Sequence, residues 1–91
     1  MTSLTNNEIK ALKMCLNYED RESQKDDNMS NAGIEEFATL FNGNRNAAGG
    51  LVSSLEKKGL GFIDDEEWDI FWLSEDGINT IFDIIEEEGG V

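Results

Sequence analysis

Five carboxylates crowd into six consecutive positions of the chain: Asp64, Asp65, Glu66, Glu67 and Asp69. Carboxylate oxygens are the ligands that calcium and magnesium prefer in proteins. A calcium-binding loop, however, spaces its ligands at alternate positions around a glycine, and this run has neither feature. We therefore expect a solvated loop at this position, with no metal bound.

Other groups able to do chemistry are few. The chain has no histidine and one cysteine, Cys15, which falls on the apolar face of a predicted helix. Nothing nearby in the sequence would activate its thiolate, so we expect a small core residue. The segment NAAGG, residues 46–50, lacks the lysine and hydroxyl residue of a phosphate-binding loop. We expect neither catalytic activity nor a cofactor.

The charge of the chain is strongly negative. Seven Lys and Arg stand against 20 Asp and Glu, which gives a net charge of −13, and no cation follows Lys58. Such a chain repels nucleic acids and anionic membranes and attracts basic surfaces. It shows neither a signal-peptide pattern nor an apolar run long enough to span a membrane, and its one cysteine suits a reducing compartment. We expect a cytoplasmic protein without membrane contact.

Apolar spacing predicts four helices in one domain over residues 1–91. The first opens with a capping box formed by Thr5 and Glu8, and a stripe from Ile9 to Leu16 follows at helical spacing. Further helices are predicted over about 33–42, over about 45–58, and after a cap at Ser74. Apolar residues vanish after residue 18, so we interpret residues 19–31 as a loop. Residues 1–3 and 87–91 are expected to fray.

Two short apolar segments, 60–63 and 68–73, predict the strands of a β-hairpin with the carboxylate run at its tip. If Leu73 points into the core, Phe71 and Asp69 share its face, and Trp68, Ile70 and Trp72 line the opposite face. These three apolar side chains either pack on the first helix or the chain termini, or they form a contact with a partner.

The order of these elements, with two sequence motifs, resembles the winged helix-turn-helix domain of MarR-like regulators. The segment FATLFNGNRNAAGGLVSSLEKKGLGFI, residues 37–63, contains the run LEKKGL before the first strand, and LSEDG, residues 73–77, enters the last helix. The resemblance covers residues 34–82. It implies an α+β fold: a single winged helix-turn-helix domain of about four helices with a two-stranded β-hairpin wing.

In that family the helix corresponding to 45–58 enters the major groove of DNA and the wing lies along the backbone. The resemblance implies that the groove-facing positions are Asn44, Arg45, Asn46, Gly49, Gly50, Ser53 and Ser54. Only Asn44, Arg45 and Asn46 among them could contact bases or phosphates. A specific DNA binder neutralises ~6–10 phosphates with cations, whereas this chain has seven cations in all and an acidic wing tip.

The sequence therefore favours a non-enzymatic acidic winged-helix module that binds a basic protein surface, a role that includes acting as a DNA mimic or regulatory competitor. The predicted partner-binding residues are those of the wing: Asp64, Asp65, Glu66, Glu67, Trp68, Asp69, Ile70 and Trp72. The alternative is a dimeric DNA-binding transcriptional regulator that uses Asn44, Arg45 and Asn46. A third option is a homodimerisation domain that uses Ile84 and the outer wing face.

Overall fold

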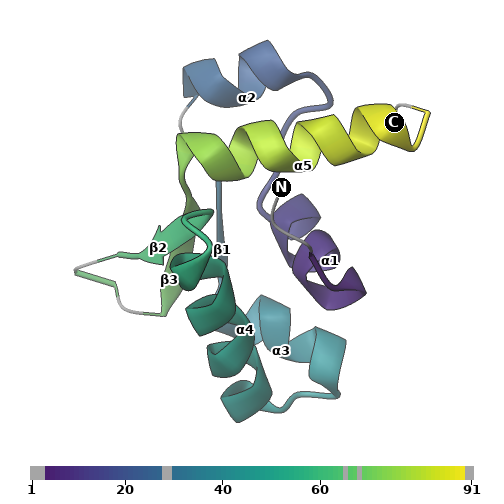
Figure 1. Cartoon of the computed structure of the whole chain (residues 1–91). Coiled ribbons are helices and arrows are strands. Elements are labelled where there is room, and N and C mark those ends of the chain that lie inside the picture. Colours follow the sequence, from purple (N-terminus) through teal and green to yellow (C-terminus); the bar gives the residue numbers. More distant parts are fainter. Residues whose placement is uncertain (1–3, 28–29, 65, 68, 90–91) are drawn as a thin grey trace.

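The computed structural model describes residues 4–27, 30–64, 66–67 and 69–89. Over these residues the fold is α+β, with five α-helices and a small antiparallel sheet (Figure 1). The elements in chain order are α1 (Asn6–Met14), α2 (Arg21–Asp27), β1 (Asn31–Gly33), α3 (Ile34–Ala38), the 3-10 helix η1 (Thr39–Phe41), α4 (Arg45–Lys57), β2 (Gly61–Ile63), β3 (Ile70–Leu73) and α5 (Glu75–Glu87).

The predicted helix starts are confirmed by their caps. Thr5 Oγ1 accepts the Glu8 amide at 3.1 Å and Glu8 Oε1 accepts the Thr5 amide at 2.8 Å, which is the expected capping box. Asn44 caps α4, and Ser74 caps α5. The predicted helix over 33–42 is present as α3 and η1, and it ends where Asn42 adopts a left-handed conformation (φ 56°).

The prediction of a loop over residues 19–31 was wrong, because this segment contains α2 and the first residue of β1. Figure 1 shows α2 beside α5, and Arg21 of α2 donates to Asp83 at 2.6 Å and to Glu86 at 2.7 Å, both on α5. Gln24 is fully buried. Polar contacts hold this helix in place. Because it has no apolar stripe, hydrophobic spacing did not predict it.

Gln24 also fixes the chain on either side of α2. Its Oε1 accepts the backbone amides of Asn17 and Tyr18 at 2.7 and 2.9 Å, and its Nε2 donates to the Ser30 hydroxyl. Ser30 lies directly before β1, and its carbonyl accepts the Leu73 amide at 2.8 Å. One buried amide side chain thus links the end of α1, α2 and the sheet.

The sheet has three strands in the order β1-β3-β2, not the predicted two. β2 and β3 are antiparallel neighbours, as expected, with Gly61 opposite Leu73, Phe62 opposite Trp72 and Ile63 opposite Phe71. β1 covers the other edge of β3, where Asn31 lies opposite Trp72. The third strand was not predicted: it begins at the end of the predicted loop and runs to the start of the helix predicted over 33–42.

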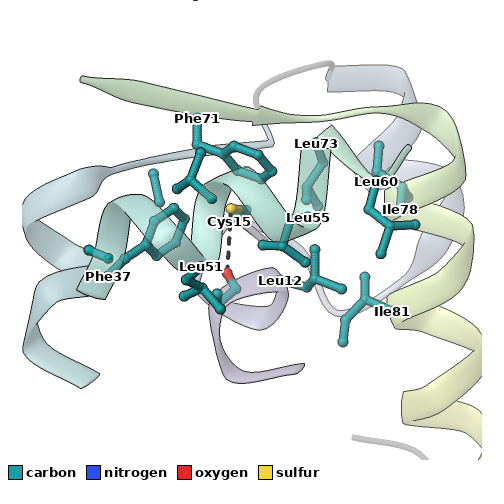
Figure 2. Packing of buried hydrophobic residues seen from close by; sticks show 14 of the residues in the cluster. Leu12, Cys15, Phe37, Leu51, Leu55, Leu60, Phe71, Leu73, Ile78 and Ile81 are labelled. Carbon is teal, nitrogen blue, oxygen red and sulfur yellow. Dashed lines mark hydrogen bonds between the residues drawn. The ribbon is translucent and has the colours of Figure 1, made fainter. Parts of the chain in front are cut away.

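The core lies between the sheet and the helices, as Figure 2 shows. Phe37 and Phe71 meet edge to face, with ring centroids 5.8 Å apart, and α1, α4 and α5 contribute buried aliphatic side chains. Cys15 is fully buried among them, and its thiol donates to the Ala11 carbonyl at 3.5 Å. Burial, with the charge of Glu36, raises the pKa of Cys15 to about 12. Its predicted place in the core is confirmed.

The last helix continues into the glutamate run and ends at Glu87, the first of the residues that were expected to fray. Two ion pairs offset the repulsion between these carboxylates: Arg21 binds Glu86, and Lys13 of α1 binds Glu88 at 2.9 Å. None of the described helices is both long and apolar enough to cross a membrane.

Candidate protein-interaction surface

The outer face of the sheet carries a row of aromatic side chains. Residues opposite each other in an antiparallel pair project from the same face, and Phe71 and Leu73 are buried. Trp72 and its neighbour Phe62 therefore project from the other face. Phe62 is 52% exposed, while Trp72 is half-buried. We call Phe62 and Trp72 the aromatic row.

The predicted alternation along β3 is confirmed where the structure describes it. Phe71 and Leu73 are buried, and Ile70 and Trp72 are half-buried. Asp69, expected on the buried face, is instead exposed, because it lies in the turn before β3 begins. The predicted contact residue Trp68 lies outside the described residues.

Phe62 was missed as a surface residue by the sequence reasoning. Its segment, Gly-Phe-Ile, is too short to show which side chain faces the core. The pairing with β3 settles this, because it places Phe62 opposite Trp72 and Ile63 opposite the buried Phe71. The exposed aromatic surface is therefore shared by two strands.

Asp64 organises the connection between β2 and β3. Its Oδ1 accepts the backbone amides of Glu66 at 2.8 Å and Glu67 at 3.1 Å, and its Oδ2 accepts the Trp72 indole N–H at 2.9 Å. The bonds from the two amides, with that from the indole, hold the pKa of Asp64 below its usual range. This carboxylate is thus occupied in folding the turn and orienting an aromatic ring.

The remaining described carboxylates of this turn, Glu66, Glu67 and Asp69, are exposed to water. Asp65, which was predicted with them, lies outside the described residues. We call Asp64, Glu66, Glu67 and Asp69 the acidic turn. The turn is also tied to the body of the protein, since the Asp69 carbonyl accepts the Ile34 amide of α3 at 2.9 Å. The structure thereby places three solvated carboxylates beside the aromatic row.

The predicted DNA-contacting residues cluster at the start of α4, where each is exposed. Two of them already have partners within the chain. The Asn44 side chain accepts the Ala47 amide at 3.1 Å, and Arg45 donates to Glu35 of α3 at 2.9 Å. Asn46 is exposed beside them. This arrangement leaves little uncompensated positive charge at the helix start.

The seven cations lie on α1, α2 and α4 or directly after α4. Lys13, Arg21, Arg45 and Lys58 each take part in an ion pair with a carboxylate. The other three, Lys10, Lys25 and Lys57, belong to α1, α2 and α4 and form no ion pair with the carboxylates that the structure describes.

A buried ion pair links α1 to the end of α4, and its carboxylate was predicted from the sequence only as part of a helix cap. Glu8 is 2% exposed. Lys58 Nζ donates to both of its oxygens, at 2.7 and 2.9 Å, and the Ser54 hydroxyl donates at 2.8 Å. Burial alone would raise the pKa of Glu8, but the bonds from Lys58, Thr5 and Ser54 lower it from 4.5 to about 2. This network joins α1 to the end of α4.

Comparison with other proteins adds no assignment. The chain matches no protein-family model, and comparison with curated proteins and with solved structures finds no significant similarity. Within the described residues, His, Cys, Asp and Glu side chains form no group of three or more that could hold a metal ion. The geometry and charge of the described surface are therefore the basis for a functional proposal.

Proposed function

We propose that this chain is an acidic winged-helix module, with β2 and β3 as its wing, that binds a basic protein surface without catalysing a reaction. The observation that carries the proposal is the aromatic row beside the acidic turn. Phe62 and Trp72 offer apolar area at the centre of the contact, where aromatic residues commonly supply most of the binding energy.

The acidic turn supplies the other half of the contact. Glu66, Glu67 and Asp69 are exposed, and they would steer a cationic partner toward the aromatic row, because complementary charge raises the rate of encounter. Asp64 keeps the turn and the Trp72 ring in a fixed relation before binding. A preorganised surface loses less conformational entropy when it binds.

A protein surface that otherwise binds DNA phosphates would suit this module, because such a surface is basic. The module would then compete with DNA for that surface. Direct DNA binding through Asn44, Arg45 and Asn46 has less support, since Asn44 caps α4 and Arg45 is paired with Glu35. The chain offers seven cations against 20 carboxylates to any DNA ligand.

Affinity capture with matched variants tests the proposal. The tagged wild type, a Phe62→Ser/Glu66→Lys/Glu67→Lys variant and a Glu22→Lys/Glu56→Lys control are each incubated with lysate of the source cells. The control makes the same change of net charge at exposed positions on α2 and α4. We expect a basic protein to be retained by the wild type and the control and lost by the wing variant. Equal retention by all three, or loss from both variants, would reject a specific contact through the wing.

A further inference from the structure

A concave surface lies between the end of α1 and the C-terminal half of α5. Leu16, Tyr18, Phe82 and Ile85 form its apolar walls, and its volume is about 250 Å³. The Tyr18 side chain is 42% exposed, so its ring is available for contact. In Figure 1, α1 and the end of α5 lie on the opposite side of the molecule from β2 and β3. We call this surface the α1–α5 groove.

Charged residues border the groove. Lys13 and Glu88 form an ion pair at its edge, with their nitrogen and oxygen atoms 2.9 Å apart, so the charge of the lysine is compensated. Glu19 also borders the groove and forms no ion pair among the described residues. All charged residues of α5 are carboxylates, and Arg21 compensates part of the charge of Asp83 and Glu86. A partner segment that places a side chain in the groove would therefore face net negative charge.

The geometry points to a single large apolar side chain as the occupant of the α1–α5 groove, presented by a lysine- or arginine-rich helix of a protein partner. Pockets for small-molecule ligands usually measure ~300–1,000 Å³, and this groove is smaller than that range. Charge complementarity selects the partner. A second copy of this chain would bring another net charge of −13 to the same face, whereas a basic helix would be attracted.

This site is separate from the aromatic row, and the inference does not depend on the function proposed above. The probe that tests it is a short helical peptide of lysine and alanine with one central phenylalanine, and the control peptide carries serine at that position. Each is titrated into the protein labelled at isoleucine and leucine methyl groups. We expect the methyl signals of Leu16 and Ile85 to shift and saturate with the phenylalanine peptide alone.

Matched variants locate the contact. Tyr18→Ala removes one wall of the groove and should weaken binding of the phenylalanine peptide about tenfold, as expected for a central aromatic residue. Phe62→Ala, on the sheet, should leave that affinity unchanged. Glu19→Lys should also weaken binding. Because Glu19 is exposed, this variant should keep the fold and can test the contact even if Tyr18→Ala disturbs the fold.

Three results would overturn the inference. Equal shifts with both peptides would indicate nonspecific attraction to a negative protein. Shifts confined to the sheet, with sensitivity to Phe62→Ala, would place apolar binding at the aromatic row and leave the proposed function standing. No shift at Leu16 or Ile85 with either peptide would show that the groove does not accept the side chain.

Discussion

Of the substitutions that each remove one cation from this protein, Lys58→Met should cause the largest loss of stability. The substitution keeps most of the side-chain volume and removes the charge. Glu8, which is 2% exposed, would then keep its hydrogen bonds from Thr5 and Ser54 and lose both bonds from the ammonium group. A buried carboxylate without its counter-ion is strongly destabilising, typically by ~3–5 kcal/mol.

The lowered pKa of Glu8 gives an independent magnitude. A fall from 4.5 to about 2 corresponds to about 3 kcal/mol, at about 1.36 kcal/mol for each unit of pKa. Because the pKa is lower in the folded protein, the ionised carboxylate stabilises the fold above about pH 4.5, and this contribution is lost as the pH falls toward 2. At neutral pH the network therefore contributes its full stabilisation.

Urea unfolding of the wild type, Glu8→Gln, Lys58→Met and the double variant measures the coupling between the two residues. We expect a coupling of ~1–3 kcal/mol at pH 7, because Thr5 and Ser54 account for part of the lowered pKa of Glu8, and a decline of this coupling below pH 4.5. Lys13→Met is the matched control, since it removes a cation from an exposed pair whose side chains are 41% and 50% exposed. Such pairs contribute ~0–1 kcal/mol. A Glu8–Lys58 coupling below ~0.5 kcal/mol, or equal losses in Lys58→Met and Lys13→Met, would refute the reasoning.

Three further predictions concern single positions. Gln24→Ala should lower the free energy of unfolding by ~1–3 kcal/mol, because it removes the acceptor of two backbone amides, and faster hydrogen exchange in α2 would accompany the loss. Cys15, with a pKa of about 12, should resist iodoacetamide at about pH 8 in the native protein and react after unfolding in urea; rapid native alkylation would contradict its burial. Gly77→Ala should lower the free energy of unfolding in urea by ~1–3 kcal/mol, since a β-carbon there would lie 2.0 Å from the Leu60 carbonyl oxygen. Gly50→Ala, in open space on α4, should raise it by ~0.5–1 kcal/mol. Equal effects of the two substitutions would contradict the packing of α5 against Leu60.

The helices with an apolar stripe could be predicted from the sequence, and α2 could not. Apolar periodicity placed the starts of α1, α4 and α5 correctly. The caps predicted at Thr5 and Ser74 are present, because a cap acts locally on the amides that follow it. In α2 the stabilising contacts come from Gln24 and Arg21, whose partners lie elsewhere in the chain. The spacing of hydrophobic residues cannot predict such long-range polar contacts.

The sequence predicted which β3 side chains face outward on the candidate surface, but not the roles of Phe62 and Asp64. Alternation along β3 separated Phe71 from Trp72 correctly, because a strand projects successive side chains to opposite faces. The role of Phe62 depends on strand register, and the role of Asp64 depends on the turn geometry that brings its carboxylate to an indole eight residues later. Neither relation is visible before the strands are paired.

One titration tests the central claim most directly, which is that the acidic wing contacts a protein surface and has replaced contact with DNA. The protein is added to labelled duplex DNA at ~20 mM salt, where electrostatic attraction is least screened, and fluorescence anisotropy is followed. With Arg45 paired to Glu35 and a net charge of −13, we predict no change in anisotropy. A rise that weakens steeply with added salt and disappears in Arg45→Glu would contradict the account and establish α4 as a DNA-binding helix.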